Sequence, residues 1–363
     1  MLQTEYPSHF YFKYSKARHN FLAAASESAT FIESWQHPLR GLGGEKLYLD
    51  LAWFGDRHAS KVLLLISGTH GVEGYCGSGI QVGSIRTGWH READEQVAIA
   101  MLHGLNPYGM SHLRRVDEAG IDVNRNFIDF QQPLPSNKLY DDLVEVIIPP
   151  QWTTETQTQT LDRLTEYLYH TPDGIADLAK GQYQYWYAPF YGGEVPSWSN
   201  RVLQQIGDRF LEDKQAVGIL DYHTGLGQHA TGQLITLPST SGAESKLVRS
   251  IWGDKAVIAG SEQSVTTYTP KGTVIAALQA RLANSRYVAA AYEFGTIPEN
   301  EVFQALRADH WLYLHGDLED ELAIQIKQNM LDAFYCDRPD WQKSVCDLAF
   351  AAQAELLAGL RSL

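Results

Sequence analysis

The sequence predicts an α/β protein built on one mixed, mostly parallel β-sheet with helices on both faces. Apolar runs of strand length recur along the chain, and several are continuously apolar, which is typical of strands buried on both sides. Segments with the apolar spacing of helices lie between these runs, and this alternation indicates a covered α/β sheet. Polar residues follow several of the apolar runs, at the end where open α/β sheets bind their ligands.

Six segments are expected to form strands, because they are short and rich in β-branched, aromatic or other apolar residues. Several of them show no alternation of apolar and polar residues, so both of their faces are expected to be covered. The six segments are Leu47–Phe54, Val62–Ser67, Val97–Leu102, Val217–Tyr222, Gln233–Leu237 and Tyr287–Phe294.

Helical spacing of apolar residues predicts the segments that lie before and between these strands. They are Phe21–Gln36, Gly79–Thr87, Leu161–Tyr169, Asn200–Asp213, Ala243–Trp252 and Val274–Leu282. Three amphipathic segments follow the last predicted strand, at Glu301–Leu314, Asp320–Phe334 and Trp341–Leu360.

One domain is expected over residues 1–363, because the chain has no internal repeat, low-complexity tract or linker rich in Pro and Ser. The stretch 133–196 differs from the rest and is predicted to be an inserted segment. It holds Pro149 and Pro150, a helical piece and the aromatic cluster Tyr183–Tyr191 (YQYWYAPFY). Such a cluster either lines a substrate cleft or seals the insertion against the main body.

The composition is that of an ordinary globular protein, with 44% hydrophobic and 20% charged residues. The net charge of −14 disfavours nucleic acids and anionic membranes as partners, because both are polyanions. The apolar runs are too short to span a bilayer, and the N-terminal residues lack the apolar core of a signal peptide. The three cysteines form no CxxC motif and argue against a disulfide framework. We therefore expect a cytoplasmic protein.

The segment KVLLLISGTHGVEGYCGS, Lys61–Ser78, presents His70 and Glu73 in a Gly-rich turn after an apolar run. A neutral imidazole nitrogen and a carboxylate oxygen are both suited to zinc. Among thirteen histidines one His-x-x-Glu pair could arise by chance, so the pair needs further ligands to be meaningful.

Three other segments place polar side chains where an apolar run ends. Val217–Gly225 ends with His223 near its last positions, Tyr287–Thr296 carries Glu293 in a similar place, and His103–Phe127 is a polar loop. Because ligands bind at the carboxyl ends of strands in open sheets, we expect these side chains to meet His70 and Glu73 at one edge. The loop contributes Arg114, Arg115, Asn124 and Arg125.

Five short motifs occur in an order that resembles the zinc carboxypeptidase superfamily, most closely its uncharacterised bacterial and archaeal subgroup. The resemblance runs from about Lys61 to Leu312 and implies a zinc carboxypeptidase-like (phosphorylase/hydrolase-like) fold. Two of the motifs also occur, in altered form, in the related aspartoacylase and succinylglutamate desuccinylase branch. The motifs are HGVEG (His70–Gly74), NPYG (Asn106–Gly109), DVNRNF (Asp122–Phe127), DYHTG (Asp221–Gly225) and YEFGT (Tyr292–Thr296).

This resemblance implies that His70, Glu73 and His223 hold one zinc ion and leave a position open for water. Zinc in such a site polarises a carbonyl and lowers the pKa of bound water. Glu293 would be the general base, and its alternative role is a carboxylate paired with a nearby arginine. A second metal is left open, with His229 as a candidate ligand.

The resemblance also implies how a substrate is held. Asn124 and Arg125 would grip a free carboxylate, for which a guanidinium offers two parallel donors. Either Arg114 or Arg115 would stabilise the developing oxyanion, while the other forms a surface salt bridge. Tyr268, in TTYTPKG, would close over the substrate or else is an exposed turn residue.

Asp221 precedes His223 by two residues, so on an alternating strand both side chains point to the same face. Asp221 is therefore expected either to orient an imidazole or to make a plain structural hydrogen bond.

The predicted activity is zinc-dependent hydrolysis of an amide bond in a substrate with a free carboxylate. The first reading is a carboxypeptidase acting on a small peptide, and the alternative is an N-acyl amino acid deacylase. A non-catalytic metal-binding or ligand-binding protein is a third reading, against which Glu293 counts. Gly71 and Val72 stand where the best-known digestive carboxypeptidases carry an arginine, which argues against extended peptides. Side-chain preference and oligomeric state stay open.

Overall fold

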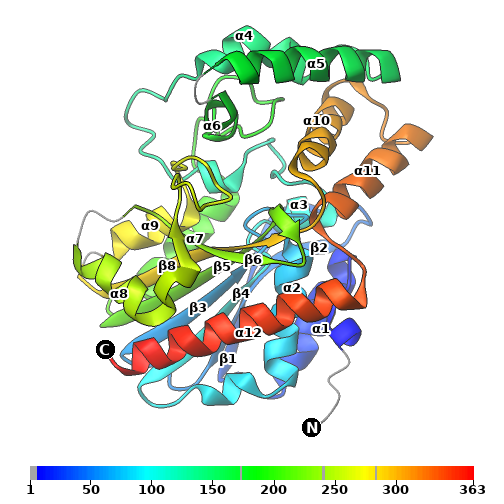
Figure 1. The fold of residues 1–363 in the computed structure, drawn as a ribbon. Helices are drawn as coiled ribbons and strands as arrows, with labels where there is room; N and C mark the ends of the chain where they lie inside the picture. The colour runs from blue at the N-terminus through cyan, green and yellow to red at the C-terminus, as the bar shows by residue number, and fades with distance from the viewer. Residues whose placement is uncertain (1–5, 172–173, 239–241, 283) are drawn as a thin grey trace.

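The computed structural model describes residues 6–171, 174–238, 242–282 and 284–363. Within these residues eight strands form one sheet in the order β1-β2-β4-β3-β5-β8-β6-β7 (Figure 1). The strands are β1 (Phe31–Arg40), β2 (Lys46–Phe54), β3 (Lys61–Ser67), β4 (Val97–His103), β5 (Ala216–His229), β6 (Gly232–Thr236), β7 (Ala256–Ile258) and β8 (Arg286–Gly295).

Helices precede, connect and follow these strands, and among the described residues none is long and apolar enough to cross a membrane. The α-helices are α1 (Tyr14–Ser26), α2 (Gly74–Arg86), α3 (Pro107–Ser111), α4 (Lys138–Ile147), α5 (Thr154–His170), α6 (Gly174–Ala179), α7 (Trp198–Phe210), α8 (Gly242–Trp252), α9 (Val274–Arg281), α10 (Glu299–His315), α11 (Glu321–Phe334) and α12 (Pro339–Arg361). Short 3₁₀ helices are η1 (Tyr6–His9), η2 (Trp89–Glu92), η3 (Val123–Arg125) and η4 (Gly253–Lys255).

The sheet is mixed, as predicted. Strands β4, β3, β5 and β8 are parallel neighbours at its centre, while β2 and β6 pair antiparallel on either side of them. The four parallel strands therefore end at one edge, and the loops that follow them carry the polar residues singled out in the sequence.

The core lies on both faces of the sheet. In β3, Leu63 and Leu65 belong to one apolar cluster, and Val62, Leu64 and Ile66 belong to the other. Helices α1, α2 and α12 contribute to the first cluster, and helices α7 and α9 contribute to the second. This double burial explains why the strand is continuously apolar and confirms the predicted α/β class.

All six predicted strands are present, but the predicted helix Phe21–Gln36 is wrong in its second half. Helix α1 ends at Ser26, and β1 then pairs antiparallel with β2, with Phe31 opposite Trp53. The start of β1 carries aromatic and β-branched residues that suit a strand, and pairing with an open sheet edge outweighs the helical spacing. Strand β7 and helices α3 and α6 are short, with three, five and six residues, and were not predicted. Helix α4 was not predicted either, although it has ten residues with a regular apolar face.

Helices α4, α5 and α6 lie beyond the carboxyl edge of the sheet, next to α10 (Figure 1), and we call these three helices the cap. They fall in the segment 133–196, whose origin as an insertion stays a prediction. Arg307 of α10 is fully buried, and its hydrogen bonds attach the cap to this helix. Its guanidinium donates to the carbonyl oxygens of Val146 and Ile147 and to Thr160 Oγ1, at 2.7–2.8 Å.

Helix α10 is itself held by a buried ionic cluster. Arg114 Nε donates to Asp309 Oδ2 at 2.9 Å, and Lys327 of α11 donates to the other carboxylate oxygen. Burial alone would raise the pKa of Asp309, but the charges of Lys327 and Arg114 outweigh it and lower that pKa to about 2. The carboxylate thus stays ionised and connects α10 to α11 and to the loop after α3.

Replacing Arg307 with Met is expected to lower the free energy of unfolding by about 2–4 kcal/mol, since each buried acceptor left without a donor costs about 1–3 kcal/mol. Urea unfolding measures this loss, and limited proteolysis should show earlier cleavage in α4 and α5. As a control, Arg338→Met removes an exposed ion pair with Asp340 and should leave the free energy of unfolding nearly unchanged. Equal stability of the two variants would contradict the anchoring role of Arg307.

Candidate active site

His70 and Glu73 lie in the short turn between β3 and α2. β3 ends at Ser67, Gly68 turns the chain with a φ of +76°, and α2 begins at Gly74, directly after Glu73. Only glycine adopts such a φ without strain. Both side chains are almost completely buried, with exposed fractions of 2% for His70 and 1% for Glu73.

The residues between His70 and Glu73 are fixed by close backbone contacts. A Cβ atom on Gly71 would lie 2.1 Å from the carbonyl carbon of Gly109, so no larger residue fits there. The Gly71 and Val72 amides donate to the carbonyl oxygens of Arg115 and Arg114, at 3.1 and 2.9 Å. Val72 is fully buried in the core. Neither position can present a charged side chain to a ligand.

His223 reaches the same place because β5 continues past the end of β3. Ser67, the last residue of β3, pairs with Tyr222, so His223 is the first residue beyond the shared edge. One potential ligand atom from each of His70, Glu73 and His223 lies within 4.8 Å of the others, and all three residues are buried. Two imidazoles and one carboxylate form a donor set that zinc favours. The three residues are therefore positioned to bind a metal ion.

Each histidine has a carboxylate beside it. His223 Nε2 donates to Asp221 Oδ2 at 2.8 Å, and Thr69 Oγ1 donates to the other oxygen of that carboxylate at 2.8 Å. Asp122 Oδ1 lies 3.4 Å from His70 Nδ1. Carboxylates in such positions orient the imidazole rings of metal sites. The hydrogen bond proposed for Asp221 is thus present.

The two arginines that the sequence could not separate take different places. Arg115 enters the site and donates to Glu73 Oε1 at 2.7 Å and to Asp122 Oδ2 at 3.2 Å. Its Nη2 also lies 2.7 Å from His70 Nε2. Arg114 points away, into its buried ion pair with Asp309. The salt bridge expected for one of them is therefore a buried one and not a surface one.

Glu293 stands opposite His223 in the register of β5 and β8. Burial and the neighbouring Glu73 carboxylate raise the pKa of Glu293 to about 8. Its Oε1 accepts a hydrogen bond from the Leu226 amide at 3.2 Å, and the described residues include no arginine in a salt bridge with it. For His70, burial and the Arg115 charge hold the pKa well below its usual value, so the ring is neutral, as a metal ligand must be.

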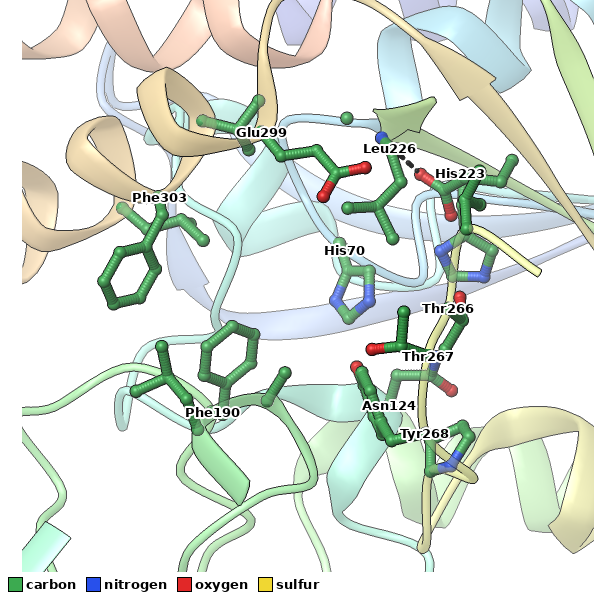
Figure 2. Close-up of a pocket in the computed structure, with 18 of the residues that line it drawn as sticks. His70, Asn124, Phe190, His223, Leu226, Thr266, Thr267, Tyr268, Glu299 and Phe303 are labelled. Carbon is green, nitrogen blue, oxygen red and sulfur yellow. Dashed lines mark hydrogen bonds between the residues drawn. The ribbon is translucent and has the colours of Figure 1, made fainter. Parts of the chain in front are cut away.

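A cavity of about 490 Å³ opens over this edge of the sheet, between the cap, α10 and the loop that precedes α9 (Figure 2). Its size and its mainly apolar lining are typical of a small-molecule site. Glu73 lies behind this lining, and Arg114 lies outside it. The predicted site residues that line the cavity are His70, Arg115, Asn124, Arg125, His223, Tyr268 and Glu293.

The predicted carboxylate clamp is partly engaged with its surroundings. Arg125 donates to the Ala179 carbonyl oxygen of the cap, and its Nη2 also donates to the Tyr268 hydroxyl at 2.8 Å. Asn124 Oδ1 accepts from the Val274 amide at 2.9 Å, which fixes the orientation of its side-chain amide. Tyr268 is therefore a cleft residue in contact with Arg125 and not a free turn residue.

Two residues of the site were not identified from the sequence. Asp122 accepts hydrogen bonds from Arg115 and from the Asn124 amide, and its only signal was its place in the DVNRNF motif. Phe190 has a φ of +60°, a strained value for a bulky side chain, and its ring lies 5.6 Å from Arg115 Cζ. The aromatic cluster thus has both of its proposed roles: Phe190 lines the cleft, and Tyr183 seals the segment by donating to the Arg125 carbonyl oxygen.

His229 lies apart from the metal-ligand group, and its Nδ1 is 2.9 Å from the Thr296 carbonyl oxygen. Among the described residues, His70, Glu73 and His223 form the one group arranged to hold a metal.

Several solved structures are similar to this chain. The structure of bovine thrombin-activatable fibrinolysis inhibitor in complex with tick carboxypeptidase inhibitor matches 98% of this chain and 98% of its own, with 11% identity and a TM-score of 0.53. Another structure of thrombin-activatable fibrinolysis inhibitor matches 99% of this chain and 76% of its own, with 11% identity and a TM-score of 0.54. Carboxypeptidase A from Helicoverpa armigera matches 89% and 74%, with 11% identity and a TM-score of 0.47. The first two likenesses confirm the predicted carboxypeptidase-like α/β fold.

A search of curated proteins finds no match. A family model described as "Protein of unknown function (DUF2817)" matches residues 10–347. That range covers nearly the whole chain and includes every residue of the candidate site. The chain therefore belongs to the DUF2817 family.

Proposed function

We propose that this protein is a zinc-dependent hydrolase that cleaves an amide bond in a substrate with a free carboxylate. The observation that carries the proposal is the content of one cavity. His70, His223, the Glu293 carboxyl and the Asn124–Arg125 pair line this cavity, and Glu73 completes the buried group with His70 and His223 from behind the lining. This combination supplies metal ligands, a proton acceptor and an anion-binding group within reach of one small molecule.

His70, Glu73 and His223 would hold the zinc ion, with Asp122 and Asp221 orienting the two imidazoles. Zinc in a site with three protein ligands supplies Lewis-acid chemistry, polarising a carbonyl group and making water more acidic. The protein contributes a rigid turn, because Gly71 and Val72 are locked against the loop that carries Arg115.

Glu293 moves the proton. Its raised pKa lies close to neutrality, where a carboxyl group can both accept and release a proton, as general acid–base catalysis requires. Glu293 accepts the proton of the attacking water and transfers it to the nitrogen of the leaving amine. The Leu226 amide holds the carboxyl group in place during both steps.

Arg115, and not Arg114, stabilises the negative charge that develops on the scissile carbonyl oxygen. Its guanidinium lines the cleft beside His70 and Glu73, so it presents a fixed positive charge at the reaction centre. Fixed donors that face developing charge provide a large part of the catalysis in acyl transfer. Asp122 holds this arginine in place through Nε.

Asn124 and Arg125 bind the free carboxylate of the substrate, with Tyr268 closing over them. A guanidinium and an amide at neighbouring positions can give a carboxylate several parallel hydrogen bonds. The Tyr268 hydroxyl already contacts Arg125 Nη2, so a bound carboxylate would lie between these groups or displace the tyrosine.

The first candidate substrate is a small peptide cleaved at its C-terminal residue. The second is an N-acyl amino acid, and the residues between the two ligands of the turn favour it. Gly71 has no room for a side chain and Val72 is fully buried, so no cation stands there to bind further peptide carbonyls. A non-catalytic binding protein would have no need for a buried carboxyl group such as Glu293.

The His223→Ala variant is expected to lose stoichiometric zinc, because one of three ligands is removed. The matched control is His229→Ala, which changes a histidine outside the ligand group and should retain the metal. Metal analysis after dialysis measures both, and thermal unfolding shows whether each variant is folded. Zinc retained by a folded His223→Ala protein would contradict the ligand assignment.

Asp122→Asn should weaken zinc binding by about 10–100-fold, as is usual when the partner of a ligating histidine is changed. Competition with a chromogenic chelator measures the dissociation constant. Asp129→Asn, in the loop that follows, alters a carboxylate that accepts from the Gln131 amide, and it should leave the constant unchanged. Equal dissociation constants for zinc in the two variants would show that Asp122 does not support zinc binding.

Glu293→Gln is expected to retain zinc and to lose activity by about 10²–10⁴-fold, the usual contribution of a general acid–base group. The assay compares C-terminal peptides with N-acyl amino acids, using zinc-loaded enzyme. Glu301→Gln, an exposed glutamate of α10, serves as the control with normal activity. Full activity in Glu293→Gln would refute the mechanism, and zinc-loaded wild type inert on both substrate sets would refute the proposed reaction.

A further inference from the structure

We propose that helices α5 and α10 form a subsite for an uncharged, apolar group on the acyl side of the scissile amide. This inference rests on the proposed function and specifies its substrate class. The acyl group is a chain or side chain of hydrocarbon character, and a second carboxylate on that side is rejected.

Two helices present apolar faces to the cavity. Residues 161, 164 and 168 of α5 are spaced by three and four positions, so they share one face of the helix. On α10, residue 306 lies four positions after 302 and three after 303, so it neighbours both of them on the helix surface. The side chains concerned, all of which line the cavity, are Leu161, Leu164, Leu168, Val302, Phe303 and Leu306.

This apolar wall lies on the acyl side of the metal-ligand group. In Figure 2, His70 is near the centre of the cavity, Phe190 and Phe303 lie to one side, and Asn124 and Tyr268 lie to the other. A substrate whose carboxylate binds at Asn124 and whose amide lies at His70 extends its remaining group toward Phe190 and Phe303. That remaining group is the acyl portion of the amide.

The wall is held in place by contacts within the protein. Arg307 directly follows Leu306 and bonds to the cap at Thr160, one position before Leu161. The two apolar faces are therefore held at a fixed separation by a buried guanidinium. A preformed apolar surface binds hydrocarbon without an ordering cost, so each added methylene contributes its burial directly.

Glu299, on the same helix as part of the apolar wall, is the residue that would disfavour negatively charged acyl groups. It is the first residue of α10, and its carboxylate is directed into the cavity (Figure 2). Glu299 is exposed at the cavity lining, and a carboxylate at the end of an acyl chain that reached it would meet a like charge and be repelled. A neutral chain of equal length avoids the repulsion. The subsite therefore separates apolar acyl groups from dicarboxylic ones such as succinyl.

The test is a series of N-acyl derivatives of one amino acid, from acetyl to octanoyl, with zinc-loaded enzyme. We expect kcat/KM to rise by about fourfold per added methylene until the cavity is filled, the factor that corresponds to about 0.8 kcal/mol per buried CH₂. N-blocked dipeptides that differ by Ala, Leu or Phe before the scissile bond form a second arm. The arm with the steeper rise shows whether an acyl chain or a peptide side chain is the source of the apolar group.

Two variants locate the effect in the wall. Leu168→Ala and Phe303→Ala change half-buried cavity residues. Both variants should show a smaller increase of kcat/KM with acyl chain length. Tyr169→Ala is the matched control for α5, because Tyr169 adjoins Leu168, is 84% exposed and lies outside the cavity lining. If kcat/KM increases with acyl chain length in both wall variants as it does in the wild type, the assignment of the subsite is overturned.

Charge rejection is tested with the pair N-succinyl and N-pentanoyl, which are similar in length. We expect at least tenfold lower kcat/KM for the succinyl compound, and Glu299→Gln should narrow this ratio. Glu301→Gln, in the same first turn but outside the cavity lining, should leave the ratio unchanged. Preference for succinyl in the wild type would overturn this part of the proposal.

Binding measurements keep this inference separate from the proposed function. Calorimetry with the Glu293→Gln protein gives dissociation constants for the same acyl series without turnover. Hydrolysis of the acetyl compound with no gain in rate or affinity for longer chains would overturn the subsite and leave the reaction standing. Affinity that rises with chain length in a protein that hydrolyses nothing would support the subsite and overturn the reaction.

Discussion

One buried carboxylate, that of Asp122, holds the three parts of the site together. Asp122 is fully buried, and its oxygens accept from Arg115 Nε and from the Asn124 amide while lying 3.4 Å from His70 Nδ1. One group therefore contacts His70, Arg115 and Asn124, the residues for which we propose the roles of metal ligand, oxyanion stabiliser and carboxylate binder. A buried anion is stable only when cations or donors surround it, so these contacts also fix Asp122 itself. The site is therefore rigid as a unit and does not depend on separate placement of each residue.

The sequence predicted those parts of the protein that a local pattern of residues specifies. The central strands were evident because burial on both faces leaves no polar position. The His70–Glu73 pair was a weak signal alone and gained weight from the positions of His223 and Glu293 at comparable strand ends. Local pattern failed where distant contacts decide. β1 is a strand because β2 offers it an edge, and Arg114 and Arg115 differ only in whether Asp309 or Asp122 is within reach. Phe190 was signalled only as a member of the aromatic cluster Tyr183–Tyr191, since its own place in the cleft depends on a strained backbone angle.

The cap covers a site that the edge of the sheet alone would leave open to solvent. A site at the carboxyl ends of strands is open to water, whereas here α5 and α6 cover it and Arg125 is bonded to the Ala179 carbonyl oxygen of the cap. Covering the site lowers the local dielectric, which strengthens the interactions of Arg115 and Arg125 with a bound anion. Burial in this site also raises the pKa of Glu293. Arg307 is therefore relevant to the chemistry although it lies outside the cavity, because it keeps the cover in place.

The distribution of charge inside the cleft gives a substrate a single productive orientation. The chain as a whole carries a net charge of −14 and repels anions at long range, yet the proposed substrate is itself an anion. Arg115 and Arg125 offset this repulsion locally, while Glu299 and the apolar faces of α5 and α10 occupy the other side. Under the proposed assignment, a molecule with one carboxylate and one apolar group would bind with the carboxylate at Arg125, because a reversed molecule would place its anion toward Glu299. Since the metal-ligand group lies between these two regions, the orientation that satisfies both ends also brings the amide bond to His70. Selection of the substrate and placement of its scissile bond thus follow from the same asymmetry.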